Sequence, residues 1–359
     1  MESMIEESNK INIIKENFNL NFKNIKHLSN SFTSLGGFVN SFCVFISVDD
    51  ILSLIYTNKD GSMIYYNIDD EKKIFSIKNA HPSYINNYIH YLDKANKRDL
   101  LISVSCKDNL LKLWDINKII CLLSINGRLS NQKGVLFSSC FLNQGKDLYI
   151  LISNCNLKGV SEPIKVYNFK SELIKEIYNS NKHTFYIDTF YDKKNLRNYI
   201  IACNKGSVVS YDYEQNKIYK TYKEMINNND EIIHIYAEVL DGADCLKVLE
   251  SCYDGNIRVW KFNTGELLSK IRVIYRQLYG FCLWDEDHLL LGCNDKSIKL
   301  VDLKKEKVVK SYFDHCVRVV AVKKIKHKKY GECLISQGAD NNGIKLWVNN
   351  KDYIFDEDD

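Results

Sequence analysis

The residues of this chain best suited to acid–base chemistry are aspartates and histidines that recur along the sequence. Five polar stretches between apolar runs each carry an aspartate: Asp60, Asp108, Asp254, Asp295 and Asp340. Two histidines, His81 and His315, recur with them, and His183 is a third candidate. A carboxylate beside an imidazole can transfer a proton as a general acid or base. The same pairs, if they belong to a repeated unit, would instead form structural hydrogen-bond networks.

No motif for a catalytic nucleophile or a phosphate-binding loop accompanies these residues. The sequence lacks GxSxG, HExxH and GxxxxGK[ST]. The acidic run from Asp285 to Asp287, followed by His288, could bind a cation, but a solvated turn is the simpler interpretation. We therefore expect a protein that is not an enzyme and that needs no cofactor, metal ion or small-molecule substrate.

One short pattern recurs along nearly the whole chain: an apolar strand, a turn with Asp or Asn, and a second strand that ends near an aromatic or apolar anchor. Its best copies are SCKDNLLKLWD around Trp114, SCYDGNIRVWK around Trp260 and GCNDKSIKLVD around Val301. With the weaker copies, the anchors are Tyr66, Trp114, Tyr167, Tyr211, Trp260, Val301 and Trp347. Successive anchors are separated by 48, 53, 44, 49, 41 and 46 residues.

This period and these motifs resemble the WD repeat, whose units of about 40–45 residues fold into four strands each. The resemblance covers residues 24–349, and it implies an all-β protein with a seven-bladed propeller fold. In WD repeats the turn aspartate bonds to nearby backbone and often to a histidine before the first strand. His81 and His315 stand where that histidine belongs, so the resemblance implies structural networks at these positions and not catalysis.

Each repeat can be divided into four strands, here called a, b, c and d in chain order. In the second repeat these are YINNYIHYL, LLISVSC, LLKLWDI and IICLLSI, which are rich in β-branched and aromatic residues. Little chain follows Trp347, whereas KNIKHLSN precedes the first strand a. By analogy with WD propellers, we expect this N-terminal segment to close the ring by pairing with the last blade. The segment KDYIF, residues 351–355, is the alternative.

Composition and the two ends of the chain limit the classes of protein to consider. Hydrophobic residues make up 45% and charged residues 26% of the chain, which are ordinary values for a globular protein. We expect an N-terminal tail at 1–22, the propeller at 23–355 and an acidic tail at 356–359. The N-terminus lacks an apolar segment, and no run is long enough to span a membrane. We therefore expect a cytoplasmic or nuclear protein that is not secreted.

Four of the twelve cysteines share one repeated position, eight residues before an anchor: Cys106, Cys203, Cys252 and Cys293. A small, weakly polar side chain suits close packing near a propeller axis. Neighbouring blades would hold these four residues apart, and the sequence has no CxxC pair. We therefore expect neither disulfides nor a metal site at these cysteines.

The one hint of a binding surface is a group of lysines in the last two repeats. We place them in the a–b and c–d turns, on one face of the ring. They are Lys304, Lys305, Lys307, Lys323, Lys324, Lys326, Lys328 and Lys329. Such a face could attract an acidic or phosphorylated protein, RNA or an anionic membrane, although lysines in turns also serve solubility alone.

The usual role of WD-repeat propellers is to bring other proteins together without catalysis, and we expect such a scaffold or adaptor here. The alternative is an anion-binding propeller that uses the basic turns to bind RNA, a ribosome-assembly particle or an acidic protein. The net charge of +4 is too small to favour nucleic acid by itself. Steep salt dependence of binding would separate the alternative from an ordinary protein scaffold.

Overall fold

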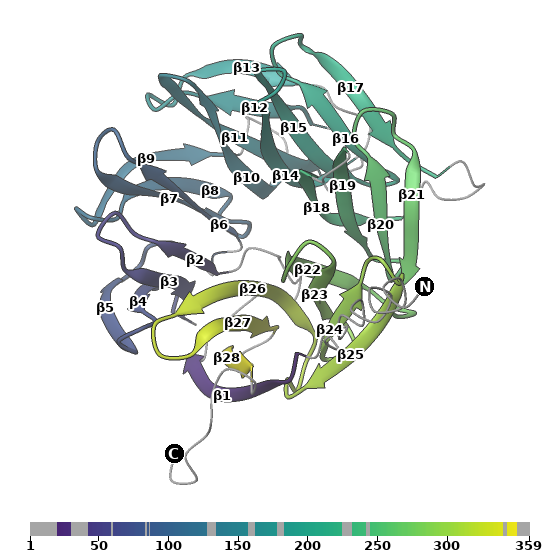
Figure 1. The fold of residues 1–359 in the computed structure, drawn as a ribbon. Helices are drawn as coiled ribbons and strands as arrows, with labels where there is room; N and C mark the ends of the chain where they lie inside the picture. The colour runs from purple at the N-terminus through teal and green to yellow at the C-terminus, as the bar shows by residue number, and fades with distance from the viewer. Residues whose placement is uncertain are drawn as a thin grey trace, which may run out of the picture.

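The computed structural model describes residues 20–29, 42–58, 60–82, 85, 87–127, 134–156, 162–177, 183–224, 232–241, 245–339 and 343–349. Over these residues the chain forms seven four-stranded antiparallel sheets, arranged as the blades of a ring (Figure 1). No helix occurs within the same ranges. The expected all-β, seven-bladed propeller is therefore confirmed.

The four strands of each blade run from the centre of the ring to its rim (Figure 1). The innermost strands, a, are β2 (Cys43–Ile46), β6 (Asn87–Asp93), β10 (Gly134–Gln144), β14 (Thr184–Asp192), β18 (His234–Asp241), β22 (Leu278–Leu283) and β26 (Val319–His327). Strands b are β3 (Leu52–Thr57), β7 (Arg98–Ser105), β11 (Asp147–Asn156), β15 (Arg197–Asn204), β19 (Leu246–Cys252), β23 (His288–Cys293) and β27 (Gly331–Gly338).

The two outer strands of each blade follow the same order. Strands c are β4 (Met63–Asn67), β8 (Leu110–Asp115), β12 (Ile164–Tyr167), β16 (Ser207–Asp212), β20 (Asn256–Lys261), β24 (Ser297–Asp302) and β28 (Ile344–Asn349). Strands d are β5 (Lys72–Ile77), β9 (Ile120–Asn126), β13 (Leu173–Ile177), β17 (Lys217–Tyr222), β21 (Leu267–Arg272), β25 (Lys307–Phe313) and β1 (Phe22–Ser29). All seven anchors lie in strands c, which confirms the repeat.

Burial within a blade follows from its position between two neighbours. All six residues of β3 are buried, because adjacent blades cover both faces of a strand b. In β5, at the rim, Lys72, Lys73 and Ile74 are exposed. The core therefore consists of layers between blades. One continuous cluster extends across two such layers and holds Cys203 of blade four, Trp260 of blade five and Leu289 of blade six.

The N-terminal segment closes the ring, as expected. β1 pairs antiparallel with β28, and Asn24 lies opposite Trp347. Phe22 is buried and packs edge-on against Trp284, with ring centroids 5.0 Å apart. The competing segment, residues 351–355, lies outside the described residues, as do residues 1–19 and the acidic tail. The predictions for the two tails therefore stay predictions.

Blade three, whose sequence repeat is the faintest, is a complete four-stranded sheet of β10 to β13. Its long b–c connection includes residues 157–161, which the structure does not describe. On either side of them, Asn154 donates to the Glu162 carboxylate at 3.1 Å, and both side chains are buried. The irregular spacing of this repeat therefore reflects a longer connection and not a missing strand.

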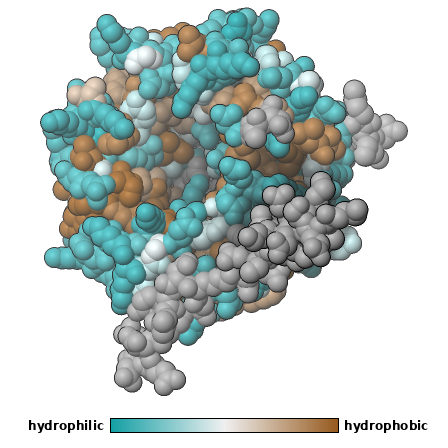
Figure 2. Space-filling model, viewed as in Figure 1, coloured by the Kyte–Doolittle hydropathy of each residue, from teal (hydrophilic) through white to brown (hydrophobic). Residues whose placement is uncertain are grey.

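The surface combines hydrophilic residues with hydrophobic areas, as the face shown in Figure 2 illustrates. Three large hydrophobic side chains are especially exposed: Tyr275 at 91%, Leu196 at 71% and Phe313 at 67%. They belong to three different blades, so they do not form one patch by themselves.

Candidate functional site

The aspartate and histidine of the repeated pattern meet in blade two. His81 Nδ1 lies 3.1 Å from Asp108 Oδ2, and His81 Nε2 lies 2.8 Å from Ser103 Oγ. The indole Nε1 of Trp114 donates to the same hydroxyl oxygen at 2.8 Å. Since Ser103 and Trp114 lie on paired strands, this network fastens the d–a and b–c turns to the sheet.

Blade seven repeats much of this arrangement. His315 Nε2 lies 2.7 Å from Ser336 Oγ, and Trp347 Nε1 donates to that oxygen at 2.7 Å. Asp340, the aspartate expected here, lies outside the described residues, so its part in the network stays a prediction. His183, the third histidine candidate, immediately precedes β14.

The geometry of the blade-two network favours a structural role. His81 is fully buried, and both of its ring nitrogens face protein groups, which leaves neither for a substrate. Burial acts to raise the pKa of Asp108, but the hydrogen bond and charge of His81 outweigh it and hold that pKa below its usual value. A carboxylate that is ionised and hydrogen-bonded to a buried histidine supports the structural interpretation.

The three other repeat aspartates that the structure describes stabilise their b–c turns. In each of these turns, one carboxylate oxygen accepts a hydrogen bond from the backbone N–H two residues later. The bonds are Ser62 to Asp60 at 2.9 Å, Asn256 to Asp254 at 3.0 Å and Ser297 to Asp295 at 3.2 Å. Such a bond closes an Asx turn, which is a conformational role without any catalytic requirement.

Three lysines that we expected in a turn lie in strand a of blade seven, so that placement was wrong. β26 extends to His327 and therefore contains Lys323, Lys324 and Lys326. The lysine-rich stretch continues as a strand because its backbone pairs with β27. Lys324 also makes a cation–π contact, since its Nζ lies 4.4 Å from the centre of the Trp284 ring.

Several basic side chains of the last two blades have acidic partners. Lys304 lies 2.6 Å from Asp287, and Lys305 lies 2.8 Å from Asp302. Two further pairs are Lys324 with Glu332 at 2.6 Å and Lys328 with Asp69 at 3.7 Å. The run Asp285–Asp287 forms the a–b turn of blade six, as expected, and supplies one of these partners. This pairing reduces the positive potential that the lysine count suggested.

Lys323 faces the interior of the ring. Its Nζ lies 5.6 Å from the centre of the Tyr236 ring in β18. Tyr236 and Glu238 raise the pKa of Lys323 against the opposing effect of burial, so the side chain keeps its positive charge. The pKa of Glu238 is also above its usual value, in this case because of burial. Lys323 therefore belongs to a polar group near the axis and not to an outer binding face.

A groove between blades five and six opens on the face formed by the a–b and c–d turns. Its volume is about 940 Å³. Its apolar lining comes from Val239, Leu240, Leu249, Val259, Leu268, Leu283 and Leu303. Four acidic and two basic residues also line it: Asp241, Asp285, Glu286, Asp287, Lys247 and Lys304. We call this feature the blade five–six groove.

A second hollow, of about 740 Å³, opens on the same face over blades two, three and four. His90, Cys140 and Asp188 of three innermost strands line it, together with the exposed Tyr191 and Leu196. Burial raises the pKa of Asp188. This hollow carries fewer charged groups than the blade five–six groove, so it offers less basis for choosing a partner.

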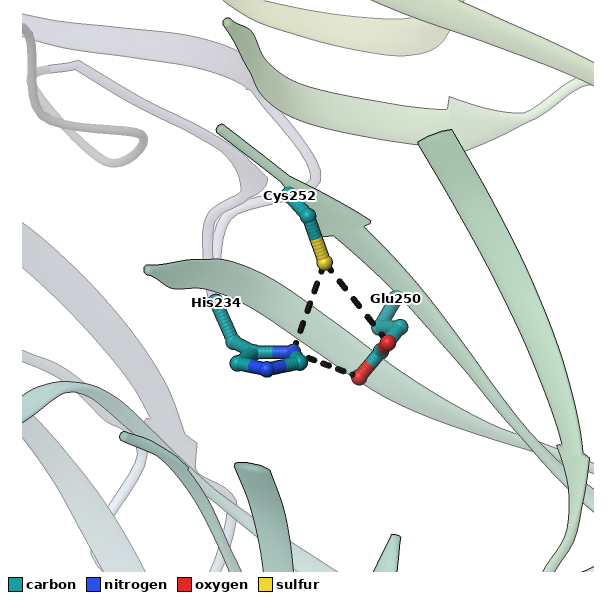
Figure 3. Close-up of side chains that lie close together, drawn as sticks. All are labelled: His234, Glu250 and Cys252. Atoms are coloured by element: carbon teal, nitrogen blue, oxygen red, sulfur yellow. Dashed lines mark hydrogen bonds and ion pairs between the residues drawn. The ribbon is translucent and has the colours of Figure 1, made fainter. Parts of the chain in front are cut away.

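One repeated cysteine belongs to a buried polar cluster that the sequence interpretation missed (Figure 3). Cys252 Sγ lies 3.3 Å from His234 Nδ1 and 3.6 Å from Glu250 Oε1. His234 Nδ1 lies 3.1 Å from Glu250 Oε2. The repeated spacing relates the cysteines only to one another, whereas strand pairing places His234 opposite Cys252. The available signal was Glu250, a charged residue within the strand b sequence KVLESC.

The four repeated cysteines are otherwise suited to packing. Burial raises the pKa of each thiol, for Cys106, Cys203, Cys252 and Cys293 alike. None of the eleven cysteines whose side chains the structure describes forms a disulfide. A protonated, buried thiol is a poor nucleophile, which argues against cysteine catalysis at these positions.

The fold defines the chain as a seven-bladed β-propeller. Neither a protein-family model nor a curated protein sequence matches it. Among the residues that the structure describes, none forms a helix long and apolar enough to cross a membrane. The propeller class therefore rests on the structure, and any finer assignment is a proposal.

Proposed function

We propose that this chain is a WD-repeat propeller that acts as a non-catalytic scaffold in the cytoplasm or nucleus. It binds other proteins and assembles them into a complex. The observation that carries this proposal is the blade five–six groove, an apolar cleft with acidic residues at its mouth on a closed ring of blades. The repeat motifs and the Asp–His–Ser–Trp network of blade two support the family assignment.

The lining of the groove indicates the chemistry of its partner. The leucines and valines suit apolar side chains, which supply most of the affinity at the centre of an interface. Four carboxylates outnumber two lysines, and Lys304 already pairs with Asp287 at 2.6 Å. The partner segment therefore carries lysine or arginine next to apolar residues, because a complementary charge steers association and disfavours acidic competitors.

The anion-binding alternative keeps some support from exposed lysines such as Lys307 and Lys326. Against it, Lys304, Lys305 and Lys328 lie beside carboxylates, and Lys323 faces the interior. A positively charged partner segment is therefore the stronger proposal.

The test uses the purified full chain and an array of short peptides of varied charge. We expect the bound peptides to combine Lys or Arg with Leu, Ile or Phe. The double variant Asp285→Lys and Glu286→Lys should weaken their binding by about tenfold or more, since it reverses charge at the mouth of the groove. Selection of acidic peptides or RNA with steep salt dependence would instead establish the anion-binding alternative.

A matched control places the same change of charge in other a–b turns. Asp49 is exposed in the a–b turn of blade one, and the exposed Asp147 begins β11 next to the a–b turn of blade three; both lie away from the groove. The double variant Asp49→Lys and Asp147→Lys should leave binding of the selected peptides within about twofold. Equal losses in the two double variants would show that overall charge, and not the groove, controls binding.

A further inference from the structure

The His234–Glu250–Cys252 cluster is positioned by one pair of strands in blade five. His234 begins β18 and lies directly opposite Cys252 at the end of β19. Glu250 is two residues before Cys252, so both side chains lie on the same face of β19. Figure 3 shows the three side chains converging, and all three are buried. The cluster lies at the d–a and b–c end of the blade, opposite the a–b turn that helps form the groove.

The three side chains can each offer one ligand atom, and these atoms lie within 4.8 Å of one another. His234 Nδ1 lies 3.3 Å from Cys252 Sγ; Glu250 places Oε2 3.1 Å from that nitrogen and Oε1 3.6 Å from the sulfur. Zinc bonds of about 2.0–2.3 Å in tetrahedral geometry place neighbouring ligand atoms about 3.3–3.6 Å apart. The nitrogen–sulfur distance falls within this range, and the carboxylate lies at a similar distance from both atoms.

The basic side chains near Glu250 contact other carboxylates more closely. Arg258 contacts Glu224 and lies 2.5 Å from Asp254, while its Nε lies 3.8 Å from Glu250. Lys270 lies 2.8 Å from Glu224. The fully buried Glu250 therefore makes its nearer contacts inside the cluster. A cation bound there would stabilise a buried carboxylate.

Among the described residues, blade five lacks the hydrogen bond from the anchor indole to a serine that blades two and seven make. Glu250 lies opposite Arg258, two residues before the anchor Trp260, and Ser103 lies opposite Lys112, two residues before Trp114. In blade two the serine accepts the indole N–H, whereas the Trp260 indole nitrogen has no partner among the described residues. Glutamate at this position therefore replaces a structural acceptor with a carboxylate directed at the cluster.

We propose that His234, Glu250 and Cys252 bind a zinc ion within blade five. A thiolate and an imidazole favour zinc over magnesium or calcium, which prefer oxygen ligands alone. On binding, the Cys252 thiol releases its proton to solvent and the sulfur bonds to Zn²⁺. The ion and the thiolate together add one positive charge beside the Glu250 carboxylate. A water molecule can complete the fourth position.

A proton on His234 would supply the same single positive charge and is the competing explanation. The experiment therefore measures metal directly on the full-length protein. The chain is stripped with a chelator and then titrated with Zn²⁺ and, separately, with Co²⁺ as a spectroscopic probe. We expect one zinc per chain by native mass spectrometry, with loss of protons, and a cobalt absorption band from thiolate-to-metal charge transfer.

Variants locate the ion at this cluster. Cys252→Ser and Glu250→Gln should each weaken zinc binding at least about tenfold, and Cys252→Ser should abolish the cobalt–thiolate band. The matched control is Cys293→Ser, because Cys293 is buried at the same repeat position in blade six. It should leave both metal affinity and the band unchanged.

Two results would overturn the proposal. One is a native full-length chain that binds no zinc at micromolar concentration and gives no thiolate band with cobalt, in which case the three side chains form a hydrogen-bonded cluster without a metal ion. The other is a Cys252→Ser variant that binds the metal as tightly as the native chain. The first result needs no variant, so it decides the question even if substitutions in this buried cluster disturb folding.

Discussion

At the scale of single residues, the blade-two network assigns a direction to each hydrogen bond. Trp114 Nε1 can only donate, so Ser103 Oγ accepts from it. The ionised Asp108 carboxylate can only accept, so His81 Nδ1 donates to it, and Nε2 of the neutral imidazole accepts from the Ser103 hydroxyl. The carboxylate therefore determines the tautomer of the neutral histidine, and the hydroxyl satisfies the buried indole.

Replacing that hydroxyl tests the network. Ser103→Ala leaves the Trp114 N–H and a His81 nitrogen without partners in a buried site, so we expect a loss of about 1–3 kcal/mol in the free energy of unfolding. Chemical denaturation measures it. Ser139→Ala is the control, because the Ser139 hydroxyl is buried without a partner among the described residues and its loss should cost less than about 0.5 kcal/mol. Similar losses in both variants would contradict the network.

The ionisation of Asp99 makes the free energy of unfolding depend on pH. Burial acts to raise its pKa, but hydrogen bonds from His90 and from the Val48 backbone of blade one outweigh burial and hold that pKa below its usual value. A folded-state pKa below the unfolded one means that Asp99 contributes stability above about pH 4, and that this contribution is lost as pH falls through the folded value.

Asp99→Asn should therefore lower the melting temperature at neutral pH, and the difference from the native chain should shrink steadily below about pH 4. Thermal unfolding followed by circular dichroism across pH 2.5–7 would measure both effects. A constant difference at every pH would mean that the Asp99 carboxylate is not the titrating group.

At the scale of elements, each b–c turn must reverse the direction of the chain within a few residues. It does so next to the d–a connection that leads to the following blade. In blade five, Gly255 has φ +81° and packs against the segment after β21. A Cβ at this position would lie 2.0 Å from the carbonyl oxygen of Ile274. Only glycine fits, because both the backbone conformation and the space exclude a side chain.

Gly255→Ala should accordingly destabilise the protein by about 3 kcal/mol or more, combining the strain of a positive φ with a collision against backbone. Gly145→Ala is the matched control. Gly145 also has a positive φ, of +69°, but its Cβ would meet nothing within 4 Å, so we expect only about 1 kcal/mol. Melting temperatures of the two variants provide the comparison, and equal shifts would show that space at Gly255 does not matter.

At the scale of the whole molecule, the ring depends on a contact between the two ends of the chain. β1 supplies the outer strand of blade seven, and Phe22 packs against Trp284 and Tyr312 of blade six. Without β1, the strand β28 would present an unpaired edge, and the layer between blades six and seven would lose part of its core.

Deleting residues 1–29 should lower the melting temperature by at least about 10 °C and cause association through the exposed edge. Light scattering and differential scanning fluorimetry would measure these effects. Adding a peptide of residues 20–29 should restore part of the loss, and a scrambled peptide should not. A truncated chain that remains monomeric with an unchanged melting temperature would show that β1 does not hold the ring closed.

Much of this architecture was predictable because it repeats. The anchors at Trp114, Trp260 and Trp347 each identify a strand c, and the turn aspartates Asp60, Asp254 and Asp295 behave alike because the same local turn demands the same acceptor. The closing strand was predictable from the segment KNIKHLSN, which precedes the first strand a and has the character of a strand d. In each case the cause lies in a local pattern that the repeats share.

Features that depend on contacts between strands and blades required the tertiary structure. The positions of Lys323 and of the His234–Glu250–Cys252 cluster depend on how far β26 extends and on which residues of β18 and β19 lie opposite each other. The groove depends on the spacing of two adjacent blades. Sequence alone determined the repeat and its strands, because local patterns encode them. Only the tertiary structure decided which polar groups meet, because register, twist and blade packing bring together residues that no local pattern relates.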